Sequence, residues 1–306
     1  MIGVTRLRAA AHVFDGGVPR VPAAATASVT DVLERLSLLD RPAALLQRAV
    51  RKLVPDGAPK DGLSGTWLGH PLHPPLTDVV VGSWTSALLL DLAGGERSRP
   101  AAKTLVGAGI LASVPTAAAG ASDWAELRGG ERRVGLVHGI GNSAALVLQI
   151  SSWRARRRGD HASGVALSTA AMGVATFSAF LGGHLSFTRG VGVNQTAFEE
   201  FPDTWTHVTD EDQLEDGEPI RRSAAGAAVM LVRYRGRIHA IADRCSHRGC
   251  SLSDGEVSND SVTCACHGSR FGLDGSLLRG PATTPQPALE VRVREGGVEV
   301  RRAPAD

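Results

Sequence analysis

All four cysteines of the 306-residue chain lie in one short stretch, and two histidines lie among them. Cys245 and His247 form a C-x-H pair, and after a short loop Cys264 and His267 form a C-x-x-H pair. Thiolate sulfur and imidazole nitrogen are ligands that proteins use for zinc and for iron–sulfur clusters. The spacing therefore predicts a metal centre that is held by two thiolates and two imidazoles.

Three kinds of site compete for these residues. Zinc accepts a Cys2His2 set, but zinc modules usually keep the cysteines together and the histidines together, whereas each arm here carries one of each. A disulfide-bonded loop with incidental histidines is the second alternative. The third is a [2Fe–2S] cluster in which two cysteines hold one iron and two histidines hold the other. The mixed arms favour this cluster.

The stretch from about residue 205 to 302 resembles the Rieske family, in the form C-x-H-x-G-C with C-x-C-H-G-S that is found in quinol–cytochrome c oxidoreductases. Many oxygenase-type members lack the second cysteine pair of this form. The resemblance implies that two histidines hold one iron, that two cysteines hold the other and that the remaining cysteines form a disulfide: His247 and His267, Cys245 and Cys264, and Cys250 and Cys266.

The resemblance also bears on the reduction potential, which is roughly −150 to +300 mV when imidazoles replace two thiolates. Ser269 matches the family serine that donates a hydrogen bond to a cluster sulfur, and Phe271 stands where high-potential members have a tyrosine. Because one hydroxyl donor is missing, we expect a potential below the top of that range. Residues 280–282 resemble the third loop, which covers the cluster.

The elements around these loops read as short strands. Apolar, β-favouring residues fill 227–234 and 237–242 on either side of a tight turn, and 289–294 and 298–302 form a closing hairpin. This pattern predicts a small antiparallel β domain. No oxygenase catalytic domain is expected after it.

Four long apolar stretches precede the cysteines, at about residues 76–93, 102–119, 134–153 and 163–183. Each is near the ~20 residues needed to cross a bilayer, and their abundant alanine and glycine suit close helix packing in lipid. Asp78 and Asp91 support the alternative of a soluble helical bundle. The regular spacing of the four stretches favours the membrane interpretation.

The start of the first stretch, Gly69-His70-Pro-Leu-His73-Pro74, resembles the HPxHP signature of a bacterial membrane family known as domain of unknown function 2231. Residues 136–142 and 181–184 match later landmarks of that family. The resemblance covers roughly residues 62–193. It implies four transmembrane helices and brings no established activity.

Four histidines of this region fall at one membrane face, here called side A, where the first helix begins and the Rieske domain follows: His70, His73, His138 and His184. Such residues could ligate haem b, bind a quinol, hold a metal ion or be structural. We expect His138 and His184 to be the redox ligands, because long helices fix them rigidly. His70 and His73, which lie where prolines break the helix, suit a gate, a metal or a proton path.

The flanking segments are less specific. Residues 1–27 show no signal peptide, and residues 21–27 read as flexible. Residues 30–53 form a basic amphipathic pattern, which either lies on a membrane surface or packs on the protein. Residues 194–217 carry many acids and no lysine or arginine, as is typical of a solvated linker.

We therefore expect an all-α four-helix transmembrane bundle followed by a small all-β Rieske domain. The predicted divisions are a tail with the amphipathic helix (1–61), the transmembrane domain (62–193), an acidic linker (194–206) and the Rieske domain (207–303). A net charge of +2 is too small to indicate nucleic acid as a partner.

The predicted function is single-electron transfer between a membrane donor, quinol or haem, and a soluble acceptor. The alternatives are an electron-supplying subunit of a separate oxygenase and a redox sensor. Membrane lipid, redox proteins and quinol are the expected partners. We expect the bacterial inner membrane. The cationic loops lean towards an external Rieske domain, but a basic tail without an export signal favours the cytoplasmic side, which we expect.

Overall fold

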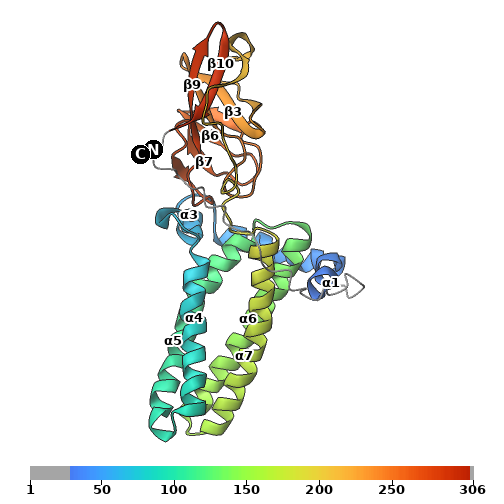
Figure 1. Cartoon of the computed structure of the whole chain (residues 1–306). Helices are drawn as coiled ribbons and strands as arrows, with labels where there is room; N and C mark the ends of the chain where they lie inside the picture. The colour runs from blue at the N-terminus through green and yellow to red at the C-terminus, as the bar shows by residue number, and fades with distance from the viewer. Residues whose placement is uncertain (1–27, 304–306) are drawn as a thin grey trace, which may run out of the picture.

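The computed structural model describes residues 28–303. The predictions of no export signal in residues 1–27 and of flexibility in residues 21–27 lie outside the described residues. Helices form one end of the molecule and strands form the other, and the two parts are stacked along its long axis (Figure 1).

Four long helices make up the bundle: α4 (His73–Ala93), α5 (Arg99–Trp124), α6 (Gly129–Arg157) and α7 (His161–Gly183). A π turn (His184–Thr188) continues the last helix, and a 3-10 turn (Glu96–Ser98) precedes α5. In the described part of the chain, these are the helices that are long and apolar enough to cross a membrane. They extend beyond the apolar stretches because polar flanking residues continue the helices. The predicted four-helix membrane domain is confirmed.

The helices pair closely as two hairpins, α4 with α5 and α6 with α7, because small residues line their contacts. The Trp84 indole N–H donates to the carbonyl oxygen of Val106 at 3.4 Å, and the indole lies over Gly109. A Cβ atom on Gly109 would lie 2.2 Å from the indole nitrogen. Small residues of this kind let membrane helices approach one another closely.

The acidic residues of α4 have different surroundings. The Asp91 carboxylate is fully buried and accepts two hydrogen bonds from the Arg156 guanidinium of α6, at 2.8 and 2.5 Å. Asp78 is exposed and near the start of its helix. Ionisable residues within a membrane domain face its interior and pair with one another, so Asp91 is compatible with a membrane helix.

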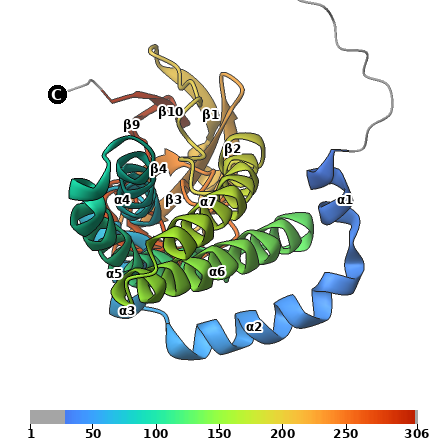
Figure 2. The ribbon, with the colours of Figure 1, turned by 90° about the horizontal axis from the view of Figure 1, so that it is seen from below.

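Shorter helices precede the bundle: α1 (Val29–Arg35), α2 (Asp40–Leu53) and α3 (Ala58–Ser64), with 3-10 turns at Ser37–Leu39 and Thr66–Leu68. Seen along the bundle, α2 runs across its end beside α6 (Figure 2). The buried Gln47 amide donates to the carbonyl oxygens of Trp124 and Leu127, at 3.1 and 2.9 Å. The helix packs on the bundle and still exposes Leu45 and Leu53, so it combines features of both sequence interpretations.

The β domain contains two antiparallel sheets. The six-stranded sheet has the order β1-β10-β9-β4-β3-β2, with β1 (Thr206–Asp210), β2 (Ile220–Ala224), β3 (Ala227–Tyr234), β4 (Arg237–Ala242), β9 (Ala288–Arg294) and β10 (Gly297–Arg302). The smaller sheet has the order β5-β6-β7-β8, with β5 (Glu256–Ser258), β6 (Ser261–Thr263), β7 (Arg270–Gly272) and β8 (Leu277–Arg279). The predicted all-β fold is confirmed.

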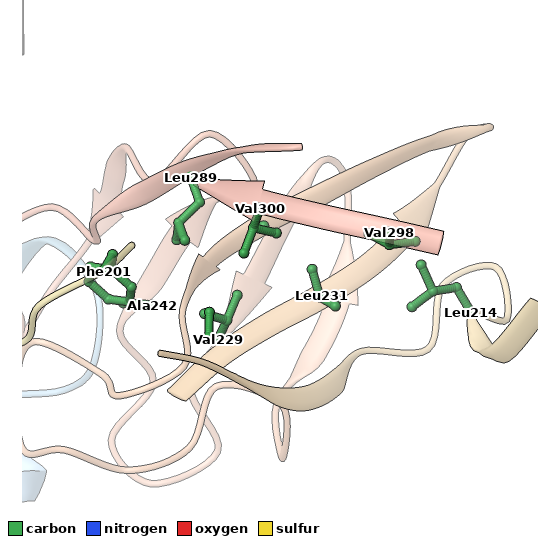
Figure 3. Packing of buried hydrophobic residues seen from close by; sticks show 10 residues of the cluster. Phe201, Leu214, Val229, Leu231, Ala242, Leu289, Val298 and Val300 are labelled. Atoms are coloured by element: carbon green, nitrogen blue, oxygen red, sulfur yellow. The ribbon is translucent and has the colours of Figure 1, made fainter. Parts of the chain in front are cut away.

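Strand β3 separates two hydrophobic cores because its side chains alternate between the two faces. Val229 and Leu231 point into the core of the large sheet (Figure 3). Met230 and Val232 point to the other side, where they join the core that contains Cys245. The cysteine loops are therefore anchored by the hydrophobic packing of both sheets.

The acidic segment is only partly a linker. Strand β1 pairs with β10 in the large sheet, and a 3-10 turn (Glu211–Gln213) follows it. Arg233 of β3 binds the Glu211 carboxylate at 3.2 Å. Residues 206–213 therefore belong to the β domain, because backbone pairing with the C-terminal strand outweighs their polarity.

The Asp91–Arg156 pair gives a test of bundle stability. We expect Asp91→Ala to lower the free energy of unfolding in detergent by about 3–5 kcal/mol, because it leaves a buried guanidinium without its partner. The matched control Asp78→Ala removes an exposed carboxylate from the same helix and should change it by less than about 0.5 kcal/mol. Denaturant titrations followed by circular dichroism measure both. Equal stability of the two variants would contradict a stabilising role for the pair.

Candidate metal centre

Two loops of the same shape carry the predicted ligands. In the first, between β4 and β5, the Cys245 N–H donates to the Cys250 carbonyl oxygen and the Gly249 N–H donates to the Cys245 carbonyl oxygen, both at 2.8 Å. In the second, between β6 and β7, the equivalent bonds join Cys264 to Ser269 at 2.8 Å and Gly268 to Cys264 at 3.0 Å. Both glycines have a positive φ, of 74° and 76°, which the turns require.

The loops bring the four predicted ligands together in like pairs. Cys245 and Cys264 are free, buried thiols, and a hydrogen bond joins their sulfur atoms. The rings of His247 and His267 meet edge to face, with centroids 5.1 Å apart. Within residues 28–303, His247 Nδ1 and His267 Nε2 are buried and have no hydrogen-bond partner. Two adjacent thiols and two adjacent imidazoles, with the buried His247 Nδ1 left unsatisfied, fit a [2Fe–2S] cluster that has sulfur on one iron and nitrogen on the other.

The electrostatics of the loops suit metal binding. Burial lowers the pKa of His247 to about 3 and also lowers the pKa of His267. Both imidazoles are therefore neutral at pH 7, which is the form that binds a metal. The hydrogen bond from the Cys245 thiol lowers the pKa of Cys264 to about 6, which favours a thiolate there.

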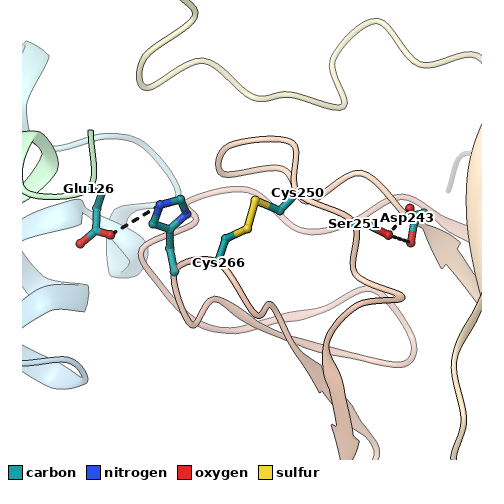
Figure 4. The surroundings of a disulfide bond; sticks show 6 residues. Glu126, Asp243, Cys250, Ser251 and Cys266 are labelled. Atoms are coloured by element: carbon teal, nitrogen blue, oxygen red, sulfur yellow. Dashed lines mark hydrogen bonds and ion pairs between the residues drawn. A yellow bond between two sulfur atoms is a disulfide. The ribbon is translucent and has the colours of Figure 1, made fainter. Parts of the chain in front are cut away.

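A disulfide joins Cys250 of the first loop to Cys266 of the second (Figure 4). The Cys264 sulfur lies within 4.8 Å of both disulfide sulfurs. The bridge therefore fixes the two loops beside the ligands, as the family resemblance implies.

Two buried polar side chains that the sequence analysis missed hold the first loop. The Asp243 carboxylate accepts a hydrogen bond from the Ser251 hydroxyl at 2.8 Å (Figure 4). It also accepts one from the Ser253 backbone N–H at 2.9 Å. The Gln286 side-chain oxygen accepts from the Ser246 N–H at 2.9 Å. Its amide nitrogen donates to the carbonyl oxygens of Ala242 and Arg244, which directly precede the first loop. No motif marks either residue in the sequence.

The third loop, residues 280–287, closes over Ser269. The Ala282 N–H donates to the Ser269 hydroxyl oxygen at 3.0 Å, and Ser269 is fully buried. Because the hydroxyl accepts this bond, its own hydrogen remains free to donate to a cluster sulfur. Phe271 lies fully buried in the core beneath the loops and brings no donor.

The cluster end of the β domain is packed on side A of the bundle. The Gly280 N–H donates to the Asp61 carboxylate at 3.0 Å, and the Thr66 hydroxyl donates to the Ala282 carbonyl oxygen at 3.1 Å. His267 Nε2 lies 3.8 Å from a carboxylate oxygen of Glu126, in the turn between α5 and α6 (Figure 4).

Charged groups strengthen this contact from both sides. Arg248, next to the predicted ligand His247, forms an ion pair with Glu131 at the start of α6. The buried Lys60 ammonium lies 3.1 Å from Glu126 and donates to the Ser122 carbonyl oxygen at 2.6 Å. These contacts join residues far apart in the sequence, and no local pattern marked them.

The membrane histidines have separate surroundings. His70 is exposed, with Nδ1 3.1 Å from the Pro71 carbonyl oxygen. His184 Nε2 lies 2.8 Å from the Glu34 carboxylate, which also binds Arg189. The structure does not support the predicted pairing of His138 with His184, because His184 is directed towards helix α1.

His73 and His138 instead have the same kind of partner. The His73 Nδ1–H donates to the Thr116 carbonyl oxygen at 3.0 Å, and the His138 Nδ1–H donates to the Ser178 carbonyl oxygen at 2.7 Å. The prediction that prolines break the chain at His73 is also wrong. Helix α4 begins at this residue, with prolines in its first turn, where the missing N–H is tolerated.

Comparison with known proteins divides the chain in the same way. Residues 204–293 match the family described as "Rieske [2Fe-2S] domain". Residues 69–195 match "Predicted membrane protein (DUF2231)". The match to an iron–sulfur domain favours the [2Fe–2S] cluster over zinc as the occupant of the four ligands.

Among curated relatives, the cytochrome b6-f complex iron-sulfur subunit of Chlorobaculum tepidum is 31% identical over 72 residues, which are 24% of this chain and 39% of that protein. Ferredoxin CarAc of Metapseudomonas resinovorans is 34% identical over 98 residues, 31% of this chain and 92% of that protein. The solved ferredoxin of carbazole 1,9a-dioxygenase from Nocardioides aromaticivorans is 29% identical, covering 33% of this chain and 99% of that one, with a TM-score of 0.32.

The ligand set can be tested by iron content. We expect purified protein to contain two irons and two labile sulfides, and each of Cys245→Ser, His247→Ala, Cys264→Ser and His267→Ala to lose them, because each removes a ligand. His207→Ala, which removes an exposed imidazole of the same domain, is the control and should keep the cluster. Metal analysis with EPR of the reduced protein measures both. Stoichiometric zinc without iron would contradict the assignment.

The hydroxyl of Ser269 allows a test of how the protein sets the reduction potential of the cluster. We expect Ser269→Ala to lower the reduction potential, because it removes a donor that stabilises the reduced cluster. Phe271→Tyr should raise it if the new hydroxyl reaches a sulfur. Ser276→Ala, at an exposed hydroxyl of the same small sheet, serves as the control. Redox titrations monitored by EPR give the potentials, and an unchanged potential in Ser269→Ala would exclude a hydrogen bond from this residue.

Proposed function

The chain belongs to the Rieske [2Fe–2S] family, and on that premise we propose that it is a membrane-anchored electron-transfer protein that passes single electrons between a donor in the membrane and a soluble acceptor. The cluster, when bound, supplies the one-electron chemistry, and the protein supplies binding, orientation and tuning. The chain spans less than half the length of the b6-f subunit that it matches, so the activity of that complex is not carried over.

One observation carries the proposal: the ligand loops face the membrane domain. His267 is buried against Glu126, and the third loop is bound to Asp61 and Thr66. A cluster at this position lies beside side A, where a membrane-soluble donor such as quinol would arrive. A Rieske domain that was merely tethered to an anchor would have no need of these contacts.

The residues of the chain have distinct roles in this scheme. Cys245 and Cys264 would hold one iron, and His247 and His267 would hold the other. The buried position of His267 excludes water from one side of the cluster. Ser269 would donate a hydrogen bond to a sulfur and thereby raise the potential.

A second candidate function is supplying electrons to a separate oxygenase. The similarity to ferredoxin CarAc, which covers 92% of that protein, favours it. In that case the helices would be an anchor alone, and an oxygenase would co-purify with the chain. The two functions differ in the donor, because only the first requires a membrane donor to reduce the cluster.

For the location we propose the bacterial inner membrane with both ends on the cytoplasmic side. Four crossings return the chain to side A, where the N-terminal helices and the Rieske domain both lie (Figure 1). Exposed leucines on α2, among them Leu45 and Leu53, would rest on the lipid surface beside its arginines.

The Arg248–Glu131 ion pair allows a test of docking. We expect Glu131→Arg to slow reduction of the cluster by quinol by up to about tenfold in proteoliposomes, since a loss of about 1.4 kcal/mol lowers the equilibrium constant for docking tenfold. The double variant Glu131→Arg with Arg248→Glu restores an attractive pair and should recover the rate. Stopped-flow spectroscopy measures the reduction.

Asp260→Arg, which reverses one charge of the exposed Arg235–Asp260 pair away from the bundle, is the control and should behave as wild type. If Glu131→Arg reduced its cluster at the wild-type rate, the docked arrangement would have no part in electron transfer.

A further inference from the structure

The membrane domain is built from two copies of one helical hairpin. In the first, His73 of α4 donates to the carbonyl oxygen of Thr116 in α5. In the second, His138 of α6 donates to the carbonyl oxygen of Ser178 in α7. Each acceptor residue carries a hydroxyl, and each is followed one helical turn later by a glycine against which the ring lies: Gly120 and Gly182.

The same equivalence continues along the helices. Counted from His73 and His138, three buried positions of α4 coincide with three of α6. Counted from the acceptor residues Thr116 and Ser178, three buried positions of α5 coincide with three of α7. In α4 and α6 these are Val80, Trp84 and Ala87 with Ala145, Gln149 and Ser152. In α5 and α7 they are Ala102, Val106 and Gly109 with Gly164, Ser168 and Ala171.

The buried ion pair between Asp91 and Arg156 also lies at equivalent positions of the two hairpins. Asp91 follows His73 at the spacing at which Arg156 follows His138, and the two bind each other. Helix α4 also contacts α7 and α5 contacts α6, as a two-fold relation between the hairpins requires. The two histidines are therefore equivalent residues of a duplicated unit, and the hairpins that carry them are in direct contact through α4 with α7 and α5 with α6.

Each ring is held in one orientation and one tautomer. A carbonyl oxygen can only accept, so Nδ1 carries the proton in both rings and Nε2 is the acceptor nitrogen. In His138 this nitrogen accepts from the side-chain amide of Asn142 at 3.1 Å, so a metal at Nε2 would displace this exposed amide. A Cβ atom on Gly120 would lie 2.7 Å from Cε1 of His73, and one on Gly182 would lie 2.9 Å from Cε1 of His138. A histidine whose Nδ1–H is bound to a backbone carbonyl is oriented to ligate a metal through Nε2.

The number of protein ligands around His73 and His138 determines which metal group could bind there. Within residues 28–303, no group of three clustered histidine, cysteine or acidic ligands includes His73 or His138. A bare zinc ion needs four ligands, which two imidazoles do not supply. Haem brings four equatorial nitrogens and needs only axial ligands, and cofactors of helix bundles are held by side chains of facing helices.

The site is also close to the cluster loops along the chain. Gly120, beside His73, precedes Glu126 by less than two helical turns, roughly 9 Å of rise. Glu126 in turn lies 3.8 Å from the cluster ligand His267. A redox group at the two histidines would be within electron-transfer reach of the cluster.

The geometry points to a haem b between the two hairpins, with His73 and His138 as axial ligands. In the exchange that follows, ferrous haem iron loses one electron and becomes ferric, and one ferric iron of the cluster gains it and becomes ferrous. A quinol from the membrane reduces the haem again, releasing two protons and supplying two successive electrons as it becomes quinone. Haem binding stands by itself, whereas the electron exchange rests on the proposed function.

The test is an optical spectrum of the full chain, produced with added haem precursor and purified in detergent. We expect one haem per chain with the absorption of a low-spin, bis-histidine iron. His73→Ala and His138→Ala should each lose this spectrum, while His70→Ala and His184→Ala should keep it.

Glycine variants test the site without removing a ligand. Gly120→Ala and Gly182→Ala place a methyl group against the rings and should lower haem occupancy at least several-fold. Gly82→Ala and Gly173→Ala, where a Cβ atom meets nothing within 4 Å, are the matched controls and should bind as wild type.

The EPR signal of the cluster is recorded in every variant and keeps the two proposals apart. Protein with an intact cluster signal that binds no haem, even when titrated with hemin, would overturn the haem site and leave the electron-transfer function standing. Bound haem in a chain without a [2Fe–2S] signal would overturn the proposed function instead. Binding of a quinone analogue at His73 and His138 in place of haem would also overturn the site.

Discussion

The rest of the structure depends on the contact between the cluster loops and the turn that joins α5 to α6. Glu126 in this turn faces His267 on one side and the buried ammonium of Lys60 on the other. The carboxylate is mostly buried and is paired with the Lys60 ammonium, so the contact to the β domain depends on α3 as well as on the turn. Removing the β domain would expose one side of this arrangement, and removing α3 would leave the acid without its cation.

This contact also explains the organisation of the helices. The turn lies at the end of two long helices, and the amide of Gln47 in α2 holds its backbone through two carbonyl oxygens. At the far end of the bundle, the Asp91–Arg156 pair joins α4 to α6. These contacts hold the helices together at both ends of the bundle, and small residues line the helix contacts between them. The ligand loops therefore pack on helix ends whose positions are held by several contacts.

Much of this architecture could be predicted from local patterns. Strands β3 and β4 occupy the predicted residues 227–234 and 237–242, because alternating apolar side chains and a tight turn specify them locally. The four membrane helices follow from apolar length. The two arms that carry the predicted ligands could be found from the spacing of their cysteines and histidines.

The remaining features depend on contacts between distant parts of the chain. Glu126 and Asp243 are single acids without a motif, and they acquire their roles only when the fold brings His267 and Ser251 to them. His73 was assigned to a broken helix because prolines follow it, yet proline is favoured in a first helical turn. His184 lies at the predicted face, but its neighbour Glu34 comes from a helix far earlier in the chain.

In the proposed function, a donor in the membrane reduces the cluster. The most direct measurement is anaerobic, freeze-quenched EPR of the full chain in proteoliposomes that contain quinol and no soluble protein. We expect the cluster signal to rise by one electron per chain within a single turnover. A cluster that stays oxidised with quinol and is reduced only when a soluble reductase is added would contradict it.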